Sequence, residues 1–315
     1  MKKVLFATTA LVATASVAAA DVTFGGYGRF GIAYDSDDGT GDSETFVTSR
    51  FRLQIDATAE TDAGVTLGAR VRIQQNATGS ASAAPGSTTA GTGINAARFF
   101  ARSGGLEVGV GNIFGAIEFM PGMYPIDLGL TGLGYDYTAY NFRADAYSSG
   151  GGAGVQNGVE VLYSAGDLSF HLSASEGARD RVAAHAAYTF SGWTVAVGLQ
   201  DSDDDDDDTE WALSVGGSVG IADVTLAYAS NGDDDGIDND ADGTLGGDHW
   251  VLAARFDVGA ATNVEVYVAD ADYFAETSYG VDFNHDLGGG VSLRGGIANR
   301  GNGDTNADLG VRFNF

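Results

Sequence analysis

Polar and apolar side chains alternate along residues 49–74, and this alternation limits the possible folds more than any other feature. In residues 50–58 the even positions are charged or polar and the odd positions are apolar, and residues 65–74 repeat the pattern after a short turn. Successive side chains of a strand point to opposite faces, so the pattern predicts a hairpin with one apolar face and one arginine-lined face. A soluble protein could bury such an apolar face, but the pattern recurs to Phe315 without a predicted helix to cover it.

The N-terminus has the composition of an export signal. Residues 1–3 form a short basic region, residues 4–17 are mainly apolar, and residues 18–20 are alanines. This order predicts a secretory signal peptide over residues 1–20, followed by one domain over residues 21–315. The alternative, a transmembrane anchor, is disfavoured because the apolar stretch is shorter than the roughly 20 residues that a spanning helix needs.

Composition excludes several classes of protein. The chain has no cysteine, so disulfides and thiolate-metal chemistry are absent. No later segment is long and apolar enough for a spanning helix. The formal charge of -27 becomes -29 without Lys2 and Lys3, and so acidic a chain is a poor partner for nucleic-acid phosphates. The 48 Gly and 3 Pro, with strand-like runs between polar turns, indicate one long β domain.

About sixteen strand-like runs follow the predicted signal peptide, an even number typical of bacterial outer-membrane barrels. Their connections alternate between tight turns and longer polar segments. Tight turns are expected near Asp62, Ser103, Gly166, Ser191, Gly220, Gly259 and Gly288. Short turns at one rim and long loops at the other suit strands that cross a bilayer. The predicted fold class is therefore all-β, a transmembrane antiparallel β-barrel.

The later runs predict which face meets lipid. One face carries large apolar side chains, as at Trp193, Val195 and Val197, and aromatic residues tend toward the run ends, where they would form girdles. The alternate positions carry Ser169, His171, Ser173, Arg255, Asp257, Asn263, Glu265, Asp282 and Asn284. Charged groups at every second position are costly in a packed core and favour a water-filled lumen.

Several segments resemble one known family. They are the opening run from Asp21 to Phe30, the arginine-rich second and third strands, the segment from Val110 to Ala116 and the terminal Arg312-Phe313-Asn314-Phe315. Over essentially the whole mature chain, the sequence resembles the Gram-negative general porins of the purple-bacterial (alphaproteobacterial) type.

This resemblance implies a sixteen-stranded homotrimeric barrel in the outer membrane, reached through the periplasm. A long third loop would fold into the lumen and narrow it, and Phe315 would help the assembly machinery recognise the chain. The implied function is that of a general diffusion porin, a water-filled channel for the passive passage of ions and small hydrophilic solutes, and not that of an enzyme.

The connection that corresponds to the third loop runs from about residue 113 to residue 156. It contains many Gly and Tyr residues and four acids, Glu118, Asp127, Asp136 and Asp145. A strand-like patch at residues 138–147 is assigned to the loop, because an additional barrel strand would make the total odd. A loop longer than about 15 residues in a compact fold is usually functional or disordered, and here the functional interpretation is favoured.

The strand phases place seven arginines from four consecutive strands on the lumen side. They are Arg29, Arg50, Arg52, Arg70, Arg72, Arg98 and Arg102. Glu118 and Asp127 are the loop acids expected to face this basic wall, and opposed charges would create a transverse field that orients dipolar solutes. Alternatively, some of the arginines pair with loop carboxylates and hold the loop, and both roles are compatible because a partly solvated pair is worth about 0 to 1 kcal/mol. The net negative charge slightly favours cations, although screening over roughly 8 Å confines its influence.

One acidic segment has the spacing of a calcium loop. Asp238, Asp240 and Asp242 precede Gly243 in a D-x-D-x-D-G pattern, but the twelfth position is His249 instead of a bidentate Glu. Calcium is therefore an optional ligand of this loop, and no cofactor is required. The alternative is a solvated acidic segment that keeps the outer surface hydrophilic.

Three other functions remain open from the residues alone. A barrel enzyme is disfavoured because His171, His185, His249 and His285 lie on separate runs, outside any recognisable nucleophile or metal motif. A substrate-specific channel for sugars or anions would carry an aromatic row or a dense set of anion ligands in its lumen. A soluble secreted β protein that uses its acidic loops for calcium would be absent from the membrane fraction.

Overall fold

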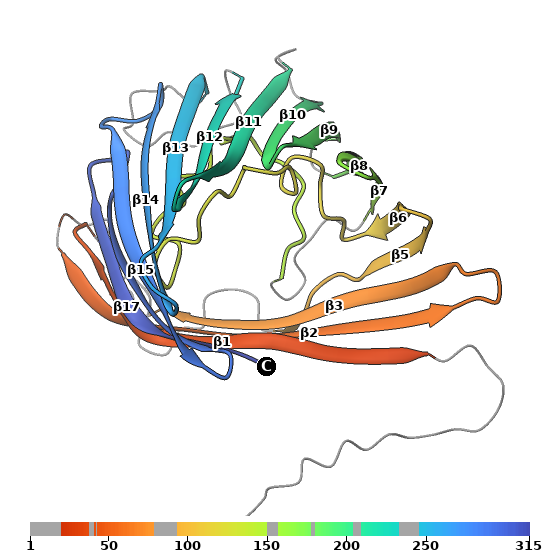
Figure 1. Cartoon of the computed structure of the whole chain (residues 1–315), viewed down its shortest axis with the longest axis horizontal. Helices are drawn as coiled ribbons and strands as arrows, with labels where there is room; N and C mark the ends of the chain where they lie inside the picture. Colours follow the sequence, from red (N-terminus) through yellow and green to blue (C-terminus); the bar gives the residue numbers. More distant parts are fainter. Residues whose placement is uncertain are drawn as a thin grey trace, which may run out of the picture.

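The chain forms a closed β-barrel (Figure 1). The structure, a computed structural model, describes residues 20–37, 41, 43–78, 93–149, 157–177, 180–203, 209–232 and 246–315. All strands in these residues belong to one antiparallel sheet, and the pairing of the first strand with the last closes it. The described residues contain no helix long and apolar enough to cross a membrane.

The strand elements follow one another around the wall in sequence order. Their bounds are β1 (Asp21–Asp35), β2 (Glu44–Glu60), β3 (Thr66–Thr78), β4 (Gly93–Ile94), β5 (Arg98–Ser103), β6 (Leu106–Gly111), β7 (Asn157–Ala165), β8 (Leu168–Glu176), β9 (Arg181–Phe190), β10 (Trp193–Ser202), β11 (Glu210–Val219), β12 (Ala222–Ser230), β13 (Asp248–Asp257), β14 (Thr262–Ala271), β15 (Ser278–Gly288), β16 (Val291–Asn299) and β17 (Thr305–Asn314). Both β4 and β5 pair with β3, so the two are parts of one strand and the wall has sixteen strands. The predicted antiparallel barrel is confirmed.

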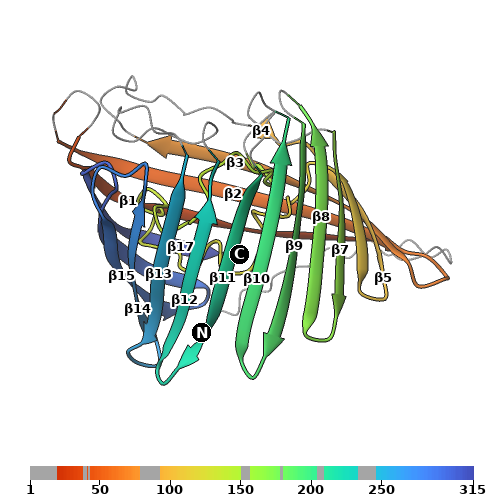
Figure 2. The same cartoon turned by 90° about the horizontal axis from the view of Figure 1, so that it is seen from above.

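The connections divide into two rims, as the sequence predicted (Figure 2). The tight turns that follow β2, β5, β7, β9, β11, β13 and β15 share one rim, and the longer connections share the other. The turn between β9 and β10 consists of Ser191 and Gly192, with φ of 49° and 82°. Two successive left-handed residues form the turn type that matches the twist of a two-residue hairpin.

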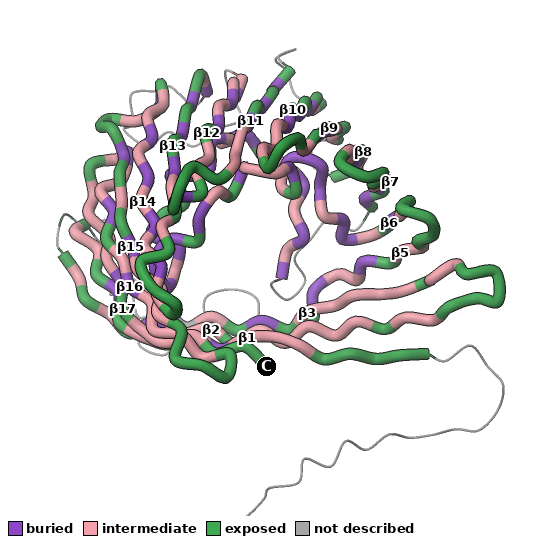
Figure 3. The backbone as a smooth tube through the Cα atoms, in the orientation of Figure 1, coloured by how far each residue is buried: buried purple, intermediate pink, exposed green. Residues whose placement is uncertain are grey.

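Residues of different burial alternate along the strands of the wall (Figure 3). In β8, Phe170 and Leu172 are 45% and 51% exposed, whereas His171 and Ser173 are 2% and 1% exposed. The apolar side chains therefore cover the outer face of the barrel and the polar ones face inward, which is the sidedness predicted from the alternation. Inside the ring, the strands from β9 to β16 present alanine at several buried positions, which include Ala183, Ala187, Ala196, Ala212, Ala227, Ala253 and Ala298.

The connection between β6 and β7 lies within the ring of strands (Figure 1). We call it the inner loop, and residues 112–149 of it are described. Its apolar side chains, including Met120, Met123, Leu128 and Leu133, pack against the alanine-lined wall. Small wall side chains leave room for the larger loop side chains, so one core forms between the loop and this side of the barrel. Residues 138–147 are irregular and add no barrel strand.

The N-terminal prediction falls largely outside the described residues. Of the predicted signal peptide, residues 1–19 are not described, and the first strand begins at Asp21.

Candidate pore constriction

Strands β17, β1, β2 and β3 carry neighbouring arginines on their lumen side. Arg29 of β1 lies opposite Arg50 of β2 on one edge and opposite Arg312 of β17 on the other. Arg52 follows Arg50 by two positions and therefore shares its face, and Arg72 lies on the same face of β3. Like charges directly opposite each other are unfavourable in a sheet, so this clustering costs stability and concentrates a positive field in the lumen.

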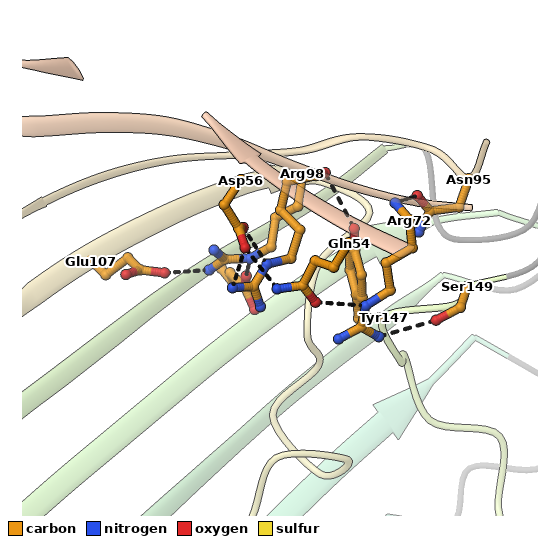
Figure 4. A network of polar contacts seen from close by, with 10 residues as sticks. Gln54, Asp56, Arg72, Asn95, Arg98, Glu107, Tyr147 and Ser149 are labelled. Carbon is orange, nitrogen blue, oxygen red and sulfur yellow. Dashed lines mark hydrogen bonds and ion pairs between the residues drawn. The ribbon is translucent and has the colours of Figure 1, made fainter. Parts of the chain in front are cut away.

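Four of these arginines, Arg29, Arg50, Arg52 and Arg72, form what we call the arginine row. Three of them donate from Nε to side-chain amide oxygens across β2 and β3, namely Arg50 to Asn76 (2.6 Å), Arg52 to Gln74 (2.5 Å) and Arg72 to Gln54 (2.9 Å; Figure 4). Arg29 donates to the backbone carbonyl of Leu130 in the inner loop. Within the described part of the chain, none of the four forms an ion pair. Neutral acceptors orient a guanidinium group without cancelling its charge.

Tyrosine rings also support the row. The guanidinium carbons of Arg52 and Arg312 lie 5.2 Å and 4.4 Å from the ring centre of Tyr27, and that of Arg72 lies 4.6 Å from the ring centre of Tyr147. These cation–π contacts hold the cations in place without neutralising them. Burial raises the pKa of Tyr135 in the inner loop, while the nearby Arg29 and Arg50 act in the opposite direction. The Tyr135 side chain, which lies near the row, is therefore a neutral phenol.

The other three predicted wall arginines behave differently. Arg70 pairs with Asp56 at 2.6 Å, so the charge of Arg70 is compensated locally. Arg98 is 2% exposed and pairs with both Glu107 and Glu160 at 2.6 Å. Arg102 is exposed next to the turn after β5, at the rim of the barrel. Of the seven predicted wall arginines, four therefore form the arginine row, two pair with carboxylates and one lies at the rim.

Arg98 belongs to a buried network that holds the start of the inner loop. Glu160 of β7 accepts from Arg98 Nε through one oxygen, and its other oxygen is 2.8 Å from His171 Nε2 and accepts from the backbone N–H of Phe114 at 3.0 Å. The Arg98 guanidinium lies 3.8 Å from the centre of the Phe114 ring. These contacts join Glu160 to Arg98, His171 and the backbone of Phe114, which fixes the loop where it leaves β6.

Glu118, one of the two loop acids, does not oppose the arginine row as the sequence analysis expected. Glu118 accepts from the hydroxyl of Tyr124 at 2.7 Å and from that of Tyr140. Burial raises the pKa of both phenols, so they remain neutral donors. No described arginine lies within ion-pair distance of Glu118. The carboxylate is shielded by the loop itself, a local fold that strand phases do not reveal.

Asp127 has cationic partners that the sequence analysis missed. It pairs with Arg294 of β16 at 2.6 Å and with Arg312 of β17 at 3.1 Å. Arg294 was not among the predicted wall arginines, and its contact with Asp127 spans 167 residues. Two further loop acids also pair with arginines outside the predicted wall, Asp136 with Arg300 and Asp145 with Arg181.

Three wall carboxylates hold the inner loop by its backbone. Glu265 accepts from the N–H of Asp127 at 3.0 Å, and Asp282 accepts from that of Gly129 at 2.6 Å. Asp308 accepts from the N–H groups of Leu130 and Thr131 at 2.9 and 2.8 Å. Gly129 has φ of 63°, and a Cβ at this position would lie 2.5 Å from Asp308 Oδ1. The residue must be glycine for the carboxylate to come this close.

We expect the double substitution Asp282→Ala/Asp308→Ala to loosen the inner loop. Each lost hydrogen bond to a charged acceptor weakens the attachment by about 1.5 to 3 kcal/mol. The expected results are greater fluctuation of the open-channel current and a larger mean conductance in planar bilayers. Asp257→Ala/Asp286→Ala is the charge-matched control, because those lumen-side carboxylates bind no backbone of the inner loop within its described residues. Equal effects of the two pairs would show that charge alone matters.

The predicted calcium ligands lie outside the described residues, which omit residues 233–245. Elsewhere, the residues that the structure describes contain no group of three or more His, Asp or Glu side chains arranged to hold a metal ion. The twelfth position of the pattern, His249, is buried in β13, and its Nδ1 lies 2.6 Å from the hydroxyl of Tyr273.

Comparison with known proteins gives one consistent result. Residues 7–305 match the family described as Gram-negative porin. The chain is 31% identical to a porin of Fuscovulum blasticum and 29% identical to a porin of Rhodobacter capsulatus, in each case over 94% of this chain and all of the relative. Among solved structures it is similar to a triple mutant of Rhodopseudomonas blastica porin, with a TM-score of 0.78, 28% identity and coverage of 94% of this chain and all of that one.

Proposed function

Because this chain belongs to the Gram-negative porin family, we propose that solutes pass between its arginine row and its inner loop. The protein is an outer-membrane channel for passive diffusion, and it is not an enzyme. Passive flux through such a channel is governed by the width and electrostatics of its narrowest part. The arginine row and the loop residues near it, Tyr135 and Asp127, are the candidates for that part.

The observation that carries the proposal is the absence of ion pairs from the arginine row in the described residues. Amide oxygens and tyrosine rings hold these guanidinium groups, so their positive charge remains available to a passing solute. Rings of arginine favour anions in pores. The net charge of -27 has little effect at the arginine row, since charges separated by more than about 8 Å are largely screened at physiological salt. The narrowest part is therefore proposed to favour anions, in contrast to the slight preference for cations inferred from net charge.

Single-channel recording in a planar bilayer under a salt gradient tests this proposal. An anion preference gives a reversal potential of the corresponding sign, and conductance steps grouped by three support the homotrimer that the family resemblance implies. A reversal potential of the cationic sign would contradict the proposed role of the row. Independent single steps, together with the molecular mass of a monomer in detergent, would contradict the trimer.

Calcium binding at Asp238, Asp240 and Asp242 remains a proposal that rests on their spacing. We expect calcium to protect the segment at residues 233–245 from limited proteolysis and a chelator to reverse that protection. Asp240→Asn is the matched variant, since it removes one charged ligand and keeps the size of the side chain. Identical cleavage rates with and without calcium would contradict binding.

The export signal is also a proposal. Cleavage after Ala20 would leave Asp21, the first residue of β1, as the mature N-terminus. N-terminal sequencing of protein purified from outer membranes tests this directly, and a mature chain that retains Lys2 and Lys3 would contradict it.

A further inference from the structure

Three guanidinium groups of the arginine row keep terminal N–H groups without a partner in the described part of the chain. Arg52 forms its hydrogen bond through Nε, which leaves both of its terminal nitrogens. Arg50 donates from Nε to Asn76 and from Nη1 to the hydroxyl of Tyr27 at 3.2 Å, which leaves Nη2. Arg29 donates from Nη1 to the inner loop and also keeps Nη2. These nitrogens remain as donors for a solute.

The remaining donors are open to the lumen. All three side chains are partly exposed, and Phe51, between Arg50 and Arg52 on the opposite face of β2, is exposed on the outside of the barrel. Among the nitrogens of the row, only Arg29 Nε is both buried and without a partner in the described residues. The unpartnered terminal nitrogens are not buried in this way, so an ion in the lumen can reach them.

The register of the sheet sets the spacing of the three cations. Arg29 lies directly opposite Arg50, and opposite side chains of a strand pair start about 5 Å apart. Arg52 lies two positions beyond Arg50 on the same strand, which corresponds to a rise of about 7 Å. A solute with two or more anionic groups can therefore contact more than one guanidinium group at once.

Oxyanions match these donors. A guanidinium group presents its N–H groups in a planar fork that fits two oxygens of a phosphate or carboxylate. Neighbouring cations repel one another, and an anion that spans them relieves more of this repulsion than a monovalent ion that meets one group at a time. The loop acid Asp127 pairs with Arg294 and Arg312 instead, so it does not occupy the remaining donors.

We propose that the arginine row is a binding site for multivalent oxyanions, solutes that carry two or more phosphate or carboxylate groups. The inference rests on the proposed function, because it concerns the same row of the channel, and it adds the class of solute that the row retains. Chloride and neutral solutes pass by diffusion, whereas a multivalent oxyanion binds to Arg29, Arg50 and Arg52 and makes its passage saturable.

Conductance in planar bilayers, measured in potassium chloride without divalent cations, tests the proposal as tripolyphosphate or citrate is added to both sides. Tripolyphosphate offers linked phosphates and citrate offers carboxylates, so the stronger of the two identifies the oxyanion that the row prefers. Potassium chloride added to the same ionic strength is the reference. The expected result is a saturable decrease in current, and a response to both anions that equals the reference would overturn the proposal.

The variant Arg52→Lys separates binding from charge. Lysine keeps the positive charge but replaces the planar fork with a single ammonium group. The half-blocking concentration should rise by about threefold to tenfold, whereas the reversal potential in potassium chloride should stay that of the unmodified protein. Arg70→Lys is the matched control, because Arg70 already donates from Nε and Nη2 to Asp56 at 2.6 and 3.3 Å. It should leave the half-blocking concentration unchanged.

The block and the reversal potential report on different proposals. An unchanged half-blocking concentration in Arg52→Lys would overturn the site, as would an equal rise in Arg70→Lys. A reversal potential of the cationic sign in potassium chloride would contradict the proposed selectivity of the constriction. Absence of block together with a reversal potential of the anionic sign would overturn this inference alone.

Discussion

Replacing Arg50 and Arg52 together with glutamine is expected to lower the anion-to-cation permeability ratio on the order of threefold to tenfold, because local potentials of several kT come from such clusters. The pair contributes half of the four guanidinium groups in the arginine row. Glutamine keeps a donor for Asn76 and Gln74, so the β2–β3 ladder should remain intact. Reversal potentials under a salt gradient measure the ratio before and after substitution.

Comparison of two single variants separates local charge from net charge. Arg52→Gln and Arg255→Gln change the net charge equally, but Arg255 lies on β13 beside Asp257 at 3.6 Å, away from the row. The effect of Arg52→Gln should be clearly larger. If the two variants shift the reversal potential equally, the row does not control selectivity and the proposal for the constriction is wrong.

Glu160→Ala is expected to reduce the free energy of unfolding by about 3 to 5 kcal/mol, the usual cost of removing one partner from a buried ion pair. The side chain of Glu160 is 0% exposed, and Arg98 and His171 beside it are each 2% exposed. Its loss would leave the Arg98 cation with one carboxylate and would free the N–H of Phe114. Urea titration of the barrel in lipid vesicles measures the change, with loss of the compact electrophoretic form as the readout.

Two variants serve as controls for this prediction. Glu107→Ala removes the other partner of Arg98, but the Glu107 side chain is 21% exposed, so solvent screens the loss and the cost should be smaller. Glu160→Gln keeps an acceptor of the same shape and should also cost less than alanine. If Glu160→Ala and Glu107→Ala were equally unstable, the buried network would not be the anchor that the geometry indicates.

Much of the barrel follows from local pattern. A strand places every second side chain on one face, so the alternation at Arg50, Arg52 and their neighbours predicts both the strand and its sidedness without knowledge of its partner. Tight turns at Ser191 and similar positions predict the hairpins between strands. Lumen-facing positions such as Asp282 could be assigned for the same reason.

The candidate site could be predicted less completely from the sequence. The alternation along the strands predicted the arginines of the row. It did not predict the difference between Arg52, which is held by an amide, and Arg98, which is neutralised by two carboxylates. The Asp127–Arg312 pair joins residues 185 positions apart, and it depends on how far an irregular loop reaches across the barrel. No periodicity along the chain encodes that reach.

The sequence by itself determined the strands, their two faces, the alternation of turns and loops, and the arginines that reach the lumen, because these depend on backbone geometry over a few residues. The tertiary structure decided which charges meet. Wall carboxylates of β14, β15 and β17 bind the backbone of the inner loop, Asp127 turns toward β16 and β17, and Glu118 is shielded by tyrosines. The physical reason is that an irregular loop is positioned by hydrogen bonds and packing against strands distant in sequence, and the closed barrel brings those strands around it.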